Sequence, residues 1–182
     1  MDNKGLDELD NKGLDELLEK NFSNVNSWLN FAEAKNAANI AFVVACIAAI
    51  FSLEDMNVLL YIISIFFIIS GMCSLISFLP RLGNKVIRKI PSFFKIKKRR
   101  ANGDNLIFFE NIKGYSGEAY IKQVCKIYFN ENKYTPTKYQ LDLSDEIVYN
   151  SNIVSCKYKL FRMAVYVDIV AFFILAFSIV LA

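Results

Sequence analysis

The sequence predicts an all-α membrane protein with three transmembrane helices, and three observations lead to this fold class. Hydrophobic residues make up 54% of the 182-residue chain, and its mean hydropathy is +0.30, both high for a water-soluble protein. The excess is concentrated in three blocks, at residues 37–53, 58–79 and 163–182. The first two blocks hold no charged residue, and the third holds only Asp168.

Each block is long enough to cross a bilayer as a helix. A membrane span needs about 20 apolar residues, with a lower limit of about 17. We therefore predict spans at about 37–53, 58–79 and 162–182. The chain divides around them into an acidic N-terminal tail (1–25), a transmembrane hairpin (26–79), a middle segment (80–159) and a C-terminal transmembrane helix (160–182).

Outside the spans, the apolar pattern is mainly helical. One helix is expected from Asn26 into the first span, one from Ser116 to about Phe129, and one from about Leu141 to Ala182. Together these make the middle segment a small, mainly helical domain between the second and third spans. The pattern leaves room for one short strand, near 105–110.

The N-terminal tail carries a tandem repeat of the octapeptide DNKGLDEL, at residues 2–9 and 10–17. Its leucines could line one side of a short helix, but Gly5 and Gly13 disfavour helix formation. We therefore expect disorder or fraying through about residue 20.

The charged residues predict how the chain is oriented in the membrane. Residues 81–100 hold nine Lys or Arg and no acid, whereas the turn between the first two spans holds Glu54 and Asp55. Basic loops stay on the cytoplasmic side of a membrane. We therefore expect the N-terminus and the middle segment in the cytoplasm, and the C-terminus at the outer face.

The composition argues against an enzyme. The chain has no His, which is the commonest general base and the commonest metal ligand. Its four Cys are scattered and show no zinc-site spacing. The run Gly114–Gly117 does not have the pattern of a phosphate-binding loop. We therefore predict no catalytic residue, no metal site and no cofactor.

The run from Pro91 to Arg100 combines two aromatic side chains, Phe93 and Phe94, with five cations. Cations on phosphates beside rings on bases are typical of a site for a nucleotide or single-stranded DNA. The alternative is an orientation signal that also contacts anionic lipid headgroups. The candidate polyanion-binding residues are Arg81, Phe93, Phe94, Lys95, Lys97, Lys98, Arg99 and Arg100.

Two polar residues inside the predicted spans are candidate pore or gate residues. Asp168 lies about five residues inside the third span, where an unpaired carboxylate is costly. It either lines or gates a pore, or it forms a structural pair with Arg162 or Lys35. Asn39 in the first span either lines or gates the pore as well, or it forms an ordinary interhelical hydrogen bond.

Several short runs occur in an order that resembles a known family. They are Phe31–Ala37 at the mouth of the first span, Phe78–Arg81 at the end of the second, Asn105–Phe109 with Ile112, and Asp145–Ile147 leading through Lys157–Tyr158 into the last span. In this order, across roughly residues 26–182, they resemble the transmembrane effectors of Pycsar antiphage systems. They are also similar to effectors of other nucleotidyltransferase-linked systems, such as Hailong.

The resemblance implies a protein of the bacterial inner membrane that damages this membrane in phage-infected cells. It also implies a role for Glu33, Lys35 and Asn36, which match the family motif at the span mouth and would form a polar ring at the cytoplasmic entrance. The alternative is an ordinary flank whose long side chains reach the headgroups. In some such systems a nucleotide opens the effector, whereas in the Hailong type a DNA oligomer holds it shut.

The sequence thus predicts the effector of an abortive-infection system that acts as an ion channel or pore. Several copies, most simply a homotetramer, would turn single polar residues into rings, and acidic rings favour cations. The ligand is expected to be a nucleotide or single-stranded DNA oligomer made by a partner nucleotidyltransferase. The alternative is a non-conducting membrane scaffold that anchors a cytoplasmic partner at the bilayer.

Overall fold

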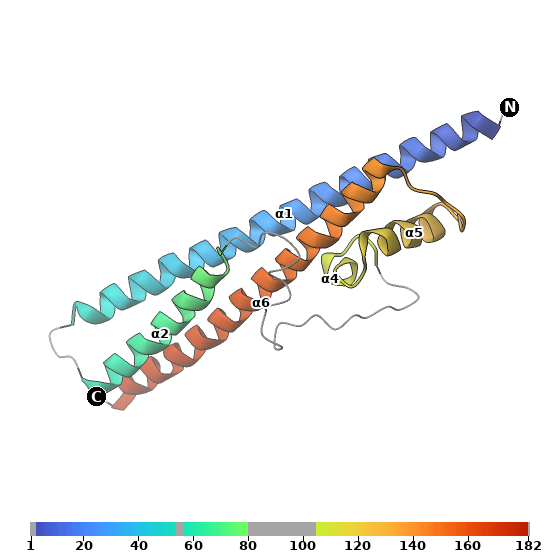
Figure 1. The fold of residues 1–182 in the computed structure, drawn as a ribbon. Helices are drawn as coiled ribbons and strands as arrows, with labels where there is room; N and C mark the ends of the chain where they lie inside the picture. The colour runs from blue at the N-terminus through green and yellow to red at the C-terminus, as the bar shows by residue number, and fades with distance from the viewer. Residues whose placement is uncertain (1–2, 54–56, 80–104, 182) are drawn as a thin grey trace. The chain divides into compact units, whose positions relative to one another are not determined.

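The computed structural model describes residues 3–53, 57–79 and 105–181, with side chains for 12–53, 57–79 and 105–178. Almost all of this part of the chain is helical, and it contains no strand. Figure 1 shows its helices, which are α1 (Asn3–Phe51), α2 (Val58–Ile76), α4 (Phe109–Ile112), α5 (Gly117–Tyr128) and α6 (Lys138–Leu181).

The helices form two compact units, and the long helices α1 and α6 contribute to both. The first unit contains the described residues 3–29 and 105–155. The second unit contains the described residues 30–53, 57–79 and 156–181. Each unit has its own buried apolar side chains.

In the first unit, α4 and α5 pack against the N-terminal part of α1 and of α6. Trp28 on α1 contacts Phe109 on α4, with ring centroids 5.7 Å apart. The Tyr120 hydroxyl on α5 accepts a hydrogen bond from Asn21 Nδ2 and donates one to the carbonyl oxygen of Leu106, both at 2.9 Å. Burial raises the pKa of Tyr120. These bonds fix the register of α1 and α5.

The helices predicted for this part of the chain are confirmed. Ser116 is the N-cap of α5, because its Oγ accepts a hydrogen bond from the Ala119 amide at 3.3 Å. The last helix, α6, has 44 residues, which corresponds to about 66 Å. Both elements begin within a few residues of the predicted positions.

The expected disorder of the N-terminal tail is wrong. The backbone is helical from Asn3, and Leu14 and Leu18 are 2% and 0% exposed. These two leucines lie one turn apart on the same side of α1, so the tail gains apolar burial that offsets the low helix propensity of its glycines.

The short strand near 105–110 does not form. The chain turns at 105–108, where Asn105 Oδ1 accepts a hydrogen bond from the Ile107 amide at 2.9 Å, and then enters α4. A strand is stable only when it pairs with a neighbour. The described residues offer no strand as a partner.

In the second unit, α2 packs against the C-terminal parts of α1 and α6 (Figure 1). The buried apolar side chains of this unit come from all three helices, and they are Val43, Ile50, Leu60, Ile63, Phe67 and Ala171. Gly71 allows α1 and α2 to approach closely, since a Cβ added there would lie 3.3 Å from Val43 Cγ1.

The three predicted spans correspond to helices that are long and apolar enough to cross a membrane. The candidate segments are Lys12–Phe51, Val58–Ile76 and Lys138–Ser178. Large apolar side chains on them face outward, among them Val58 at 76% and Phe173 at 73% exposure. Such exposed apolar surface suits contact with lipid or with other apolar helices.

Gly117 sits where α5 meets α6, and this gives a stability test. A Cβ added at Gly117 would clash with Asp145, including a distance of 2.7 Å to the Asp145 backbone nitrogen. We expect Gly117→Ala to lower the free energy of unfolding of the first unit by about 1–3 kcal/mol. Urea unfolding followed by Trp28 fluorescence measures this, because Trp28 is the single Trp of the chain and lies in the first unit.

Gly13→Ala is the matched control. A Cβ at Gly13 would make an ordinary contact of 3.6 Å with Phe129, and alanine favours a helix more than glycine does. The change is therefore expected to leave stability unaltered or to raise it by up to about 1 kcal/mol. Equal losses in both variants would contradict the packing described for Gly117.

Candidate functional site

Each helix of the second unit presents a stripe of polar side chains to the other two. On α1 the residues are spaced by three, on α2 by four and three, and on α6 by eleven, which is about three helical turns. Such spacings place the polar residues of each helix on one side. We call them the polar row: Glu33, Asn36 and Asn39 on α1, Ser70, Ser74 and Ser77 at the end of α2, and Lys157 and Asp168 on α6.

The inner end of the polar row links all three helices. Asn39 Nδ2 donates hydrogen bonds to Ser70 Oγ at 3.0 Å and to Ser74 Oγ at 3.1 Å. Ser70 Oγ in turn lies 3.2 Å from the Ala164 carbonyl oxygen on α6, to which it donates. The side chains of Ser70 and Asn39 also lie close enough to the Asp168 carboxylate to interact with it electrostatically.

Asp168 is the most unusual member of the polar row. It is only 6% exposed, and its Oδ1 atom is buried with no hydrogen-bond partner. Within the part of the chain that is described, its partners are the neutral groups of Ser70 and Asn39. A buried carboxylate without a cation nearby is costly, so its presence in an apolar helix indicates a function beyond packing.

The outer end of the polar row is built around Lys157. Its Nζ atom lies 3.1 Å from Glu33 Oε1 and donates to the Ser77 carbonyl oxygen at 2.7 Å. The Lys157 side chain is 7% exposed, whereas that of Glu33 is 44% exposed. Ser77 is the C-cap of α2, so the ammonium group of Lys157 neutralises the end of this helix.

Asn36 lies between the two ends of the row and is fully buried. Its Nδ2 atom donates to the Ala32 carbonyl oxygen at 2.8 Å and approaches the Lys157 carbonyl oxygen at 3.5 Å. The Oδ1 atom of Asn36 and the Oγ atom of Ser77 are buried without a partner. Unpaired buried oxygens are sites at which ordered water typically binds.

Lys35 does not belong to the polar row. Its Nζ atom lies over three aromatic rings, 4.5 Å from the centroid of Phe31, 5.3 Å from Tyr158 and 5.6 Å from Phe161. These cation–π contacts hold Lys35 on a different side of α1 from its neighbours Glu33 and Asn36. The three motif residues at the span mouth therefore have three different environments.

The two interpretations of the intramembrane polar residues can now be compared with the structure. The interhelical hydrogen bond named as the alternative for Asn39 is present in the structure. The structural pair of Asp168 with Arg162 or Lys35 is wrong. Among the described residues the side chains that interact with Asp168 are Ser70 and Asn39, and Lys35 lies over aromatic rings.

The candidate polyanion-binding residues lie outside the described part of the chain. They are Arg81, Phe93, Phe94, Lys95, Lys97, Lys98, Arg99 and Arg100. Sequence reasoning also missed four members of the polar row: Lys157, Ser70, Ser74 and Ser77. These three serines carry a signal in the sequence, because their spacing puts them on one side of the mainly apolar second span.

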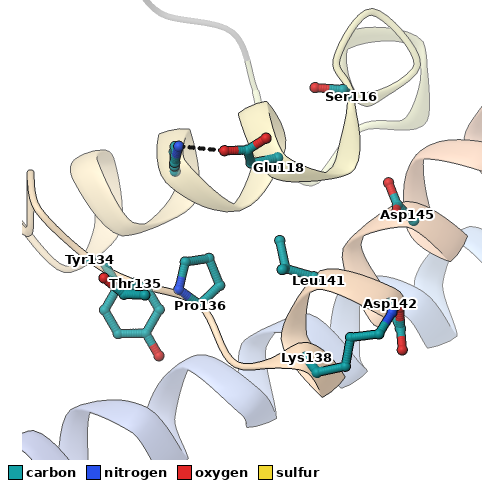
Figure 2. A pocket seen from close by; sticks show the side chains of 10 residues that line it. Ser116, Glu118, Tyr134, Thr135, Pro136, Lys138, Leu141, Asp142 and Asp145 are labelled. Atoms are coloured by element: carbon teal, nitrogen blue, oxygen red, sulfur yellow. Dashed lines mark hydrogen bonds and ion pairs between the residues drawn. The ribbon is translucent and has the colours of Figure 1, made fainter.

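The first unit contains an open pocket of about 640 Å³ between α5 and the start of α6 (Figure 2). Its charged side chains are largely engaged with one another. Lys122 Nζ lies 2.6 Å from Glu118 Oε1 and lowers the pKa of that carboxyl, and Lys138 pairs with Asp142. None of the residues predicted to bind a ligand lines this pocket.

The contacts of Lys157 give a test of the polar row. Breaking a fully buried ion pair costs about 3–5 kcal/mol, and because Glu33 is partly exposed we expect about 1–2 kcal/mol for Glu33→Gln. The double change Glu33→Gln with Lys157→Met should cost less than the sum of the two single changes. Thermal unfolding of the full chain in detergent measures this coupling, with the exposed Glu16→Gln as control. Strictly additive losses would contradict a Glu33–Lys157 interaction.

Comparison with known proteins adds the family. No curated protein and no solved structure matches the chain. The family described as the Pycsar effector protein domain matches residues 17–182. This range includes the apolar parts of all three membrane-length helices and every residue of the polar row. The chain therefore belongs to the Pycsar effector family of antiphage transmembrane effectors.

Proposed function

We propose that this effector is an oligomeric ion channel or pore of the bacterial inner membrane. The observation that carries the proposal is Asp168, a carboxylate inside a membrane-length helix that is 6% exposed and lacks a partner for one oxygen. Ionisable residues inside membranes are rare and mark functional sites, of which ion pathways are one kind. A helix that served only as an anchor would be more stable with an apolar residue at this position.

More than one copy of the chain is needed for a conducting path. Among the described residues, side chains of all three helices meet in the interior of the second unit, where a conducting path would need water. We propose a homo-oligomer, most simply a tetramer, in which copies of Asn39 and Asp168 form rings. Exposed apolar residues on the spans are available for contacts with neighbouring copies and with lipid.

We further propose that a ligand controls the channel from the cytoplasmic side. The basic run between Arg81 and Arg100 begins four residues after Ser77, where Lys157 holds the end of α2. A polyanion bound to this run could therefore act on α2 directly. The ligand would be a nucleotide or short single-stranded DNA supplied by a partner nucleotidyltransferase. The protein itself would act by ion flow and not by catalysis.

The orientation in the membrane follows from the same charges. Segment 80–159 and the N-terminus would lie in the cytoplasm, and the C-terminus would lie at the outer face. This places the nine cations of residues 81–100 on the side where an intracellular nucleotide is made.

Removal of the intramembrane polar groups should reduce conduction. We expect Asp168→Leu and Asn39→Leu to lower depolarisation and toxicity on expression in bacteria at least tenfold, because an apolar ring excludes ions. A membrane-potential dye measures the effect at matched protein levels. Ser178→Leu is the control on the same helix, since Ser178 bonds only to its own helix, at Leu175 O. A wild-type protein that never conducts in liposomes would favour the scaffold alternative.

Reversal of the basic charges should weaken ligand binding. We expect Lys97→Glu, Lys98→Glu and Arg99→Glu together to reduce the affinity for a single-stranded DNA oligomer at least tenfold, and to lessen the dependence of binding on salt. Fluorescence anisotropy with a labelled oligonucleotide measures both. A control variant reverses the exposed Lys126 and Lys133 of the first unit. An unchanged affinity in the triple variant would place the site elsewhere.

A further inference from the structure

The residues proposed to line the pore are turned into the interior of a single chain. Asn39 is 7% exposed, Ser70 and Ser74 are both 0%, and Asp168 is 6%. A side chain that lines a water-filled pore must be exposed to that water. In the conformation described here, therefore, these groups cannot yet form rings around a shared axis.

The inward-facing side chains form hydrogen bonds with one another. The Asn39 amide nitrogen lies within hydrogen-bond distance of Ser70 and Ser74 on α2, and Ser70 extends the network to α6 through Ala164 O. Asp168 joins the same network through Ser70 and Asn39. The network thus connects the three helices within one chain. In a conducting state, the same polar atoms would instead face the ions.

We propose that the contacts among Asn39, Ser70, Ser74 and Asp168 form an autoinhibitory lock that keeps each chain closed. The channel opens when α1 and α2 separate at this level, which exposes the four side chains to water and to the neighbouring copies. This inference rests on the proposed channel function. It adds that the closed state is stabilised within each chain, and that the polar groups exchange partners when the channel opens.

The chemistry of the contacts fits a reversible lock. The hydrogen-bond donors of the network are the neutral groups of Asn39 and Ser70, and interhelical bonds of this kind in membranes are individually weak. The unpaired Oδ1 of Asp168 further disfavours the closed state, because a buried acceptor without a donor is costly. At the other end of the row, by contrast, Lys157 holds α2 with a charged group. A weak lock beside a strong anchor lets part of the bundle open while the rest stays together.

The close approach of α1 and α2 near the lock allows it to be fixed covalently. Val43 is one turn beyond Asn39 on α1, and Gly71 adjoins Ser70 on α2. A Cβ at Gly71 would lie 4.0 Å from the Val43 Cβ, within the range of about 3.5–4.5 Å that a disulfide requires. The double variant Val43→Cys with Gly71→Cys is made in full-length protein whose four native cysteines are replaced by Ala.

The experiment measures cation flux from liposomes for the oxidised and the reduced form of this one protein. The lock predicts at least a tenfold lower flux after oxidation and full recovery after dithiothreitol, while each single-cysteine variant shows no redox effect. Flux that is equal before and after complete cross-linking overturns the proposal. If the cysteine-free parent conducts neither with nor without a single-stranded DNA oligomer, the channel function itself fails, and the lock fails with it.

A second variant tests the lock in the opposite direction. Ser70→Ala removes the contact between Asn39 and α6, so flux without added ligand should rise about threefold, the factor set by one average interhelical hydrogen bond. Ser64→Ala is the matched control, because Ser64 is also buried on α2 but bonds only to Leu60 O of its own helix. A fall in flux for Ser70→Ala, or equal changes in both variants, would contradict a closing role for this network.

Discussion

The need to satisfy buried polar groups without water is the constraint on which the second unit depends. A hydrocarbon surrounding offers no hydrogen-bond partner, so each polar side chain in a membrane-length helix must find one on another helix or on its own backbone. Asn39 meets this need with two serines of α2, and Ser70 meets it with the backbone of α6. The positions of these groups along the three helices therefore set the register in which the helices pack.

The first unit is organised by a different balance of forces. Its core depends on apolar contacts such as Trp28 with Phe109, and on a few buried hydrogen bonds such as that of Tyr120 with Asn21. Many of its charged residues are exposed and paired, as Lys122 is with Glu118. Pairs of this kind contribute little to stability in water. Each of the two long helices α1 and α6 therefore carries exposed charged residues in the first unit and exposed apolar residues in the second.

Hydropathy predicts the spans because a helix that crosses a bilayer needs about 20 consecutive apolar residues, and such a run can be read directly from a sequence. The partner of a polar residue is not visible in the same way. Asn39 was predicted to bond between helices, but only the packed helices show that Ser70 and Ser74 accept its bonds. For Asp168 the sequence leaves open a pore role or a basic partner, because charge alone does not show that its position on α6 brings it to the neutral groups of Ser70 and Asn39. The tail was misjudged because burial of Leu14 and Leu18 depends on the fold of the first unit.

The contact between Lys157 and Ser77 has a consequence for how sequences of this kind can change. The atom that Lys157 binds on α2 is a backbone carbonyl oxygen, which every amino acid carries. Substitution of Ser77 would therefore preserve the contact. An insertion or deletion of one residue within α2 would instead move that carbonyl by about 1.5 Å along the axis and about 100° around it, and would turn Ser70 and Ser74 away from α1 together. Natural variation at position 77 should thus be tolerant of residue type, whereas α2 as a whole should be intolerant of changes in residue number.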